Sequence, residues 1–293
     1  MVTSYKPNPR TTLRPSKAPN LPMAPNQYAS QFHEQFSNAL RLYFSQVDNF
    51  TLGMSSEAGG AYLKFPNGAF HQDGYTTLTA NMSNNSTTPI RVVSTAGFLN
   101  AGTLIIESEL IAYTGKTATT FTGITRGVYG STNVAHTAGV YVSEAQSVPS
   151  PTTALTVAFT ATDVSNQVFI DPIDITKVVH NIAGYYNIQF SLQMLTFDGT
   201  IDNVTVWFRQ NGVDVPYSAG IATVPGIHAG GPGTAIISWN LVLPMDAGDY
   251  IQLMVASNTG NTVCATYPPG TSPVHPASPS IILTSTFVSA LYA

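Results

Sequence analysis

The residues of this sequence that could do acid–base or metal chemistry form two close pairs. His71 and Asp73 lie two positions apart, and so do Glu107 and Glu109. Alternate residues of a β-strand share a face, so the two glutamates could be the paired carboxylates of a glycosidase, and the first pair could bind a metal. No other catalytic pattern accompanies either pair. We therefore expect a protein that is not an enzyme, with no catalytic residues.

Other metal and cofactor patterns are also missing from the sequence. The glycine-rich residues 229–233 are not followed by the Lys-Ser or Lys-Thr of a phosphate-binding loop. The histidines are scattered without the HExxH spacing, and a single cysteine cannot form a zinc-binding cysteine pair. We expect neither a metal site nor a cofactor site. The six histidines are His33, His71, His136, His180, His228 and His275.

The composition favours a folded β-protein. Charged residues make up 9% of the chain, whereas about 25% is usual for globular domains. Disordered chains combine low hydrophobicity with high charge, but this chain is 43% hydrophobic and has 14 Tyr and 14 Phe. Its polarity comes largely from Thr, Ser, Asn and Gln, which suit strands and turns. The net charge of −4, with 11 Lys and Arg, predicts that nucleic acid is not a partner.

The sequence also predicts where the protein is made. It has no run of about eighteen apolar residues that could insert into a membrane, and its first residues lack the apolar segment of a signal peptide. The single Cys264 excludes an internal disulfide, as expected of a protein made in a reducing cytoplasm. Cys264 lies between Val263 and Ala265 in a strand-like stretch, so we interpret it as a core residue.

The N-terminal part of the chain predicts an arm and a helix. Residues 1–26 contain six prolines and four basic residues, which predicts an extended arm that is either a flexible tail or an anchor docked on a neighbouring protein. Residues 27–50 have helical periodicity. Their apolar stripe could pack on its own domain or form a trimeric bundle, and we expect the second arrangement. The stripe consists of Tyr28, Phe32, Phe36, Leu40, Tyr43 and Val47.

The rest of the chain reads as strands and turns. Apolar and polar residues alternate through residues 185–195, 203–209, 235–243, 251–255 and 281–287. Asn211 and Gly212 predict a type I′ hairpin turn. We expect a mostly β fold, a jelly-roll β-sandwich formed by residues 51–85 and 147–293. Residues 86–146 contain short strands flanked by polar linkers, and we interpret them as a small inserted β-module.

Two groups of motifs resemble known phage proteins. The segments STAGF (94–98), GTLII (102–106), ELIAYT (109–114) and TGITRG (122–127), followed by Ala135 and His136, resemble a small β-module of tail and fibre proteins of tailed bacteriophages. In this resemblance Glu109 is a structural position. The segments FPNGAF (65–70), GYYNIQF (184–190) and WFRQNGVDV (207–215) are similar to jelly-roll modules of phage structural proteins. Those modules are related in architecture to the trimeric heads of complement and tumour-necrosis-factor proteins.

The resemblance implies a homotrimeric virion protein made in the host bacterium. Residues 1–26 would attach it to other virion proteins, and the β-head would point outward as a tail fibre or spike that contacts a host glycan or protein. The insertion between Phe70 and Tyr185 departs from the simplest family layout, so the strand order is open. A capsid decoration or head-fibre protein is the first alternative. A carbohydrate-binding or carbohydrate-active module is the second, with His228, Tyr267 and His275 in loops 219–233 and 266–279 lining a sugar site.

Overall fold

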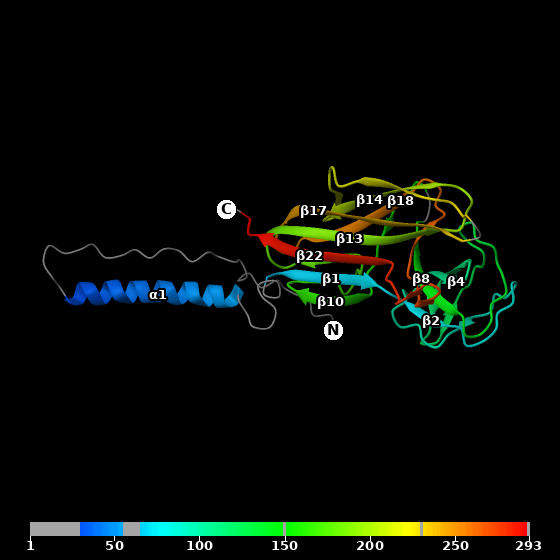
Figure 1. The fold of residues 1–293 in the computed structure, drawn as a ribbon, viewed down its shortest axis with the longest axis horizontal. Coiled ribbons are helices and arrows are strands. Elements are labelled where there is room, and N and C mark those ends of the chain that lie inside the picture. Colours follow the sequence, from blue (N-terminus) through cyan, green and yellow to red (C-terminus); the bar gives the residue numbers. More distant parts are fainter. Residues whose placement is uncertain (1–29, 55–64, 149–150, 229–230, 292–293) are drawn as a thin grey trace.

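A computed structural model describes residues 30–54, 65–148, 151–228 and 231–291 of the chain, and its fold is mostly β with one N-terminal helix (Figure 1). The predicted arm, residues 1–26, and Tyr28 of the predicted stripe lie outside the described residues. The two expectations that fall on them, anchoring and the start of the helix, therefore stay predictions.

Helix α1 covers Ser30–Met54, so it ends four residues later than predicted. Phe32, Phe36, Leu40, Tyr43 and Val47 are half-buried on one side of the helix, and the rings of Phe32 and Phe36 stack with their centroids 6.0 Å apart. Figure 1 shows α1 projecting away from the strands. Accordingly, no described α1 side chain belongs to a hydrophobic core cluster. No helix in the described ranges is long and apolar enough to cross a membrane.

The larger sheet has ten antiparallel strands and curls into a half-barrel (Figure 1). Its order is β10-β1-β22-β13-β19-β8-β4-β5, with β17 added beside β13 and β2 beside β8. The bounds of these strands are β1 Asn67–Gln72, β2 Tyr75–Thr77, β4 Gly102–Ile106, β5 Glu109–Tyr113, β8 Tyr141–Ser147, β10 Ala161–Asn166, β13 Gly184–Thr196, β17 Gly233–Met245, β19 Thr262–Ala265 and β22 Ile281–Ser289.

A second sheet has seven strands in the order β11-β12-β18-β14-β15, with β16 beside β14 and β9 beside β18. Its strands are β9 Leu155–Thr156, β11 Val168–Ile170, β12 Val178–His180, β14 Asp202–Gln210, β15 Val213–Asp214, β16 Gly220–Val224 and β18 Tyr250–Ser257. Two small sheets complete the described strands: β3 Ile90–Arg91 with β6 Gly115–Lys116 and β7 Thr120–Thr122, and β20 Gly270–Thr271 with β21 Val274–His275.

The main core lies between the two larger sheets. Alternate residues of β13, such as Ile188 and Leu192, are fully buried against alternate residues of β14 and β18, such as Val206 and Leu253. This agrees with the alternation read from the sequence, because residues two apart on a strand share a face. Between β14 and β15, Asn211 (φ 51°) and Gly212 (φ 82°) both have positive φ, which confirms the type I′ turn.

The small strands before residue 148 surround a core of their own. Ile106, Ile111, Phe121 and Val142 are completely buried there. Strand β8 nevertheless pairs with β19 as well as with β4, so the hydrogen-bonded ladder continues from the larger sheet into this region. Three strands of the predicted module, β4, β5 and β8, therefore extend the larger sheet, whereas β3, β6 and β7 form their own small sheet.

Several strands were not predicted. Strand β16 and the first residue of β17 lie within residues 219–233, which were expected to be a loop, and β10, β11 and β12 were also missed. Strand β10 has the sequence ATDVSN, and none of its residues is fully buried. A strand with so little burial leaves no apolar alternation to read.

Candidate functional site

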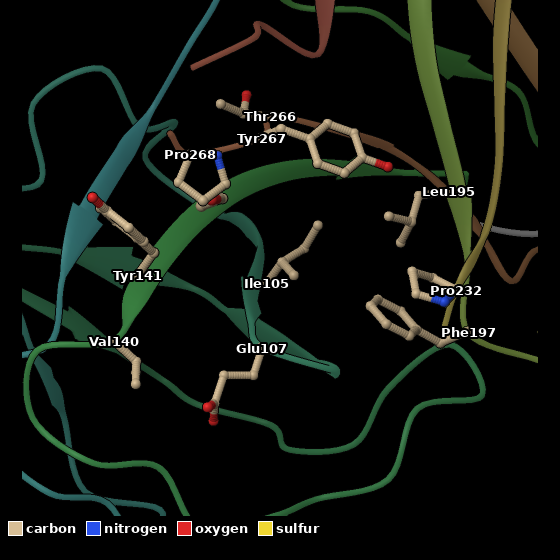
Figure 2. A pocket seen from close by; sticks show the side chains of 11 residues that line it. Ile105, Glu107, Val140, Tyr141, Leu195, Phe197, Pro232, Thr266, Tyr267 and Pro268 are labelled. Atoms are coloured by element: carbon tan, nitrogen blue, oxygen red, sulfur yellow. The ribbon is translucent and has the colours of Figure 1, made fainter. Parts of the chain in front are cut away.

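A cavity lies where the small strands meet the end of β13. It has a volume of about 390 Å³ and is largely apolar. In Figure 2, Tyr141 and Pro268 lie on one side, Leu195, Phe197 and Pro232 lie on the other, and Ile105 lies between them. The ring of Tyr267 extends across the top with its hydroxyl toward Leu195. Burial raises the pKa of Tyr267 to about 12, so its hydroxyl stays protonated at neutral pH.

Glu107 contributes the only carboxylate to the lining of this cavity. It lies in the tight turn between β4 and β5 with φ 54°, and its side chain is 52% exposed. Its Oε2 lies 2.7 Å from Nδ1 of His136. Nε2 of the same ring lies 2.8 Å from Oε2 of Glu109. A carboxylate thus faces each nitrogen of the buried His136 ring.

Glu109 is held as a buried structural ion pair. Arg126 donates from Nε at 2.5 Å to Oε1 and from Nη2 at 2.6 Å to Oε2, and the backbone N–H groups of Gly127 and Val134 donate to the same carboxylate. Burial by itself raises the pKa of Glu109, but the hydrogen bonds from Arg126, Val134 and His136 outweigh burial and lower it. Both carboxylate oxygens are occupied, and Glu107 belongs to a turn, so the two glutamates do not form an open pair on one strand.

His71 and Asp73, the other pair singled out in the sequence, lie at a second cavity of about 300 Å³. His71 of β1 approaches Asp73 with Nε2 at 3.2 Å and Asp163 of β10 with Nδ1 at 3.1 Å. The two carboxylates face different ring nitrogens and so do not converge on one point. Within the described ranges, no group of three or more His, Cys, Asp or Glu residues is arranged to hold a metal.

Two exposed tyrosines separate the cavities. The rings of Tyr75 on β2 and Tyr141 on β8 meet edge to face with centroids 6.2 Å apart, and the residues are 41% and 42% exposed. Tyr75 lines the His71 cavity, Tyr141 lines the Tyr267 cavity, and Thr266 lines both. We call the two cavities and this tyrosine pair the aromatic groove. Sequence reasoning missed it because Tyr75 and Tyr141 become neighbours only when β2 pairs with β8.

The three loop residues predicted to line a sugar site lie in different places. Tyr267 lines the aromatic groove. His275 belongs to the β20–β21 hairpin, is exposed, and lies with Nδ1 2.8 Å from the Pro276 carbonyl oxygen. His228 is exposed in a bridge with Gly231, and its Nδ1 lies 3.2 Å from the Gly226 carbonyl oxygen. Neither histidine lines the groove.

No protein-family model and no curated protein sequence matches this chain. The functions of the groove, the helix and the sheets are therefore inferred from the geometry of this structure alone.

Proposed function

We propose that this chain is a non-enzymatic structural protein of a tailed-bacteriophage virion and that it functions as a homotrimer. In this proposal the two sheets form a jelly-roll head of the complement and tumour-necrosis-factor type. Residues 1–26 attach the trimer to other virion proteins, and the head points outward as a tail fibre or spike that contacts the host surface. The observation that carries the proposal is an uncharged sheet face in a chain that also has a projecting helix with an apolar stripe.

The outer face of β17, β13 and β22 is the uncharged face. Over residues 187–193, 236–242 and 282–286 the register of the three strands places eleven side chains on it, and none of these eleven is ionisable. About 25–35% Lys, Arg, Glu and Asp is usual for the surface of a soluble domain. Depletion of charge is instead typical of the core of a subunit interface. The face consists of Asn187, Gln189, Ser191, Gln193, Ile236, Ser238, Asn240, Val242, Ile282, Thr284 and Thr286.

Apolar side chains on this face are exposed in the single chain. Ile236 is 67% exposed and Val242 53%, whereas Ile282, 41% exposed, lies at the margin of the face, where it also lines the His71 cavity. Strand β17, which carries Ile236 and Val242, has 13 residues and pairs only with β13 among the described strands. A long edge strand with free backbone groups tends to pair or aggregate unless something covers it. A second copy of the chain would cover both the edge and the face.

Helix α1 supports the same arrangement. Its stripe residues recur at steps of four and three, the spacing that places apolar residues along one seam of a helical bundle. Leu40 and Tyr43 lie in the middle of this stripe. Three copies of α1 packed along the stripe would bury it, and the helices would then lead from the attachment arm to the head.

The tail is the location we favour within the virion, because the motifs of residues 86–146 resemble those of tail and fibre proteins. A capsid decoration or head-fibre protein remains the alternative. The number of copies per particle separates the two, since a tail fibre is present in few copies and a decoration protein in many. Quantitative mass spectrometry of purified virions measures that number.

Sedimentation equilibrium of the full chain at micromolar concentration tests the oligomeric part of the proposal. We expect a mass three times the 31.1 kDa of one chain. Leu40→Asp places a charge in the stripe and should dissociate the trimer, whereas Asn38→Asp places one on the opposite side of the helix and should not. A monomer of the unaltered protein at this concentration contradicts the proposal.

A further inference from the structure

We propose that the aromatic groove binds an oligosaccharide of neutral or amino sugars. This inference rests on the proposed adhesive role and gives it a class of ligand. It concerns binding alone, without cleavage of the sugar. Its basis is the combination of two exposed aromatic rings, two adjoining cavities and two carboxylates that a histidine holds in place.

The tyrosine pair supplies flat apolar surface in an exposed position. Tyr75 and Tyr141 have accessible rings, and Tyr267 lies across the neighbouring cavity (Figure 2). Each ring combines an apolar face with a polar hydroxyl. A sugar ring is similarly mixed, because one face presents C–H groups and the rim presents hydroxyls. The three tyrosines therefore match the apolar side of a sugar.

The carboxylates supply acceptors for the sugar hydroxyls. Asp73 and Asp163 are 48% and 60% exposed at their side chains, so both have oxygens open to solvent. His71 lies between them at 3.2 and 3.1 Å and reduces their freedom before any ligand arrives. Groups ordered in advance lose less entropy on binding. Hydrogen bonds from hydroxyl donors to ionised carboxylates are also stronger than those between neutral partners.

The charge of the groove decides between sugar classes. The charged groups in the two linings are Glu107, Asp73 and Asp163, with His71 between two of them, and neither lining contains Lys or Arg. An anionic sugar, such as a uronic acid, would meet like charge at every carboxylate. A neutral sugar avoids this repulsion, and an amino sugar gains attraction.

The backbone around the groove argues against a peptide that adds a strand. The N–H of Thr266 donates to the carbonyl of Glu144, and Tyr267 exchanges both of its backbone hydrogen bonds with Ser278. Strand addition needs a row of unpaired backbone groups. These groups are already paired, so recognition at this point falls to side chains.

The arrangement of the cavities sets the minimum length of the ligand. The cavities of about 390 and 300 Å³ lie on either side of the tyrosine pair and share Thr266. A ligand of one sugar unit would occupy one of them. A chain of linked sugars would cross the tyrosine pair and use both.

Saturation-transfer NMR and calorimetry with the full chain test the inference. The probes are maltotetraose, the tetramer of N-acetylglucosamine, the tetramer of glucosamine, the anionic hyaluronan tetrasaccharide and an uncharged tyrosine-containing tetrapeptide, each at up to about 10 mM. We expect binding of at least one neutral or amino sugar, weaker or no binding of hyaluronan, and no new reducing ends. Absence of binding by all three neutral or amino sugars, tighter binding of hyaluronan, or binding of the peptide alone overturns the inference.

Variants locate the site. Tyr75→Ala combined with Tyr141→Ala should weaken binding of the sugar that binds the unaltered protein by about tenfold or more. Asp163→Asn should also weaken its binding while leaving the tyrosine rings in place. Tyr217→Ala is the matched control, because Tyr217 is fully exposed and lines neither cavity. Circular dichroism checks that each variant is folded. Equal loss in the control, or no loss in either groove variant, places the sugar elsewhere and overturns the inference.

Sedimentation of the same samples separates this inference from the proposed function. A trimer that binds none of the sugars contradicts the groove assignment and leaves the structural role intact. A monomer that binds a neutral sugar through Tyr75 and Tyr141 contradicts the trimeric role and leaves the groove assignment intact.

Discussion

The hydroxyl of Tyr113 on β5 donates a hydrogen bond of 2.8 Å to the carboxyl group of Glu144 on β8, and the two side chains meet across the intervening strand β4. Gly102 of β4 leaves room for this contact, because a Cβ there would lie 2.7 Å from Oε1 of Glu144. Burial is the largest influence on Glu144. It raises the pKa of this carboxyl to about 8, although hydrogen bonds from Tyr113 and Leu99 and the charge of Lys116 act to lower it.

Glu144 should make stability depend on pH. Its pKa is about 8 in the folded chain and 4.5 ordinarily, so between these values the folded state holds a proton that the unfolded state has released. The free energy of unfolding therefore falls as pH rises through this window, by up to about 1.4 kcal/mol per pH unit. Glu144→Gln removes the titration and should flatten the slope. Urea denaturation of both proteins at several pH values between 5 and 9 measures the slope of the free energy of unfolding against pH. Identical slopes in the two proteins would contradict the assignment of this dependence to Glu144.

Arg126 should be important for folding stability. Arg126→Met leaves the completely buried carboxylate of Glu109 without its main partner, and we expect a loss of about 3–5 kcal/mol in the free energy of unfolding. Arg209→Met is the control, because Arg209 and Asp214 form a partly exposed ion pair. Arg209→Met should lower the free energy of unfolding by about 1 kcal/mol or less. Chemical denaturation distinguishes the two, and similar losses would show that burial of Glu109 does not matter.

Cys264 should be unreactive in the folded protein. Its side chain is completely buried with Sγ 3.5 Å from Sδ of Met194, and burial raises the pKa of the thiol to about 12. The thiolate is the reactive form, so iodoacetamide at mildly alkaline pH should label the unfolded chain and spare the native one. Mass spectrometry measures the labelled fraction. Rapid labelling without denaturant would mean that this core opens readily.

The uncharged sheet face should be sensitive to added charge. Ile236→Lys and Val242→Lys place ammonium groups on it, and burying them in a subunit contact would leave them unpaired. We expect each to weaken trimer association by about tenfold or more. Val213→Lys is the control, since Val213 is 70% exposed on β15 of the other sheet. Sedimentation velocity over a dilution series gives the comparison, and an unchanged trimer in all three would exclude this face as the contact.

The sequence was most informative where strands are buried on one face. Strand β13 and the turn at Asn211 and Gly212 were predicted because apolar alternation and turn residues are local signals. The aromatic groove could not be predicted in this way. Tyr75 and Tyr141 are far apart in the sequence, and only the pairing of β2 with β8 joins them. The partners of Glu109 could not be predicted for the same reason: Arg126 and His136 lie in other segments of the chain, and only the fold brings them to Glu109.

Strand β22 follows every other described strand in the sequence, yet it lies between β1 and β13 in the larger sheet. Its Ile281 pairs with Gln72 on one side and with Leu192 on the other. A ribosome that makes this chain must therefore release residues 281–289 before β1 and β13 can be bridged. Contacts between residues so distant in sequence form slowly, and the edges of β1 and β13 that pair with β22 stay unpaired until β22 has been synthesised. The larger sheet should accordingly close only after translation has passed β22.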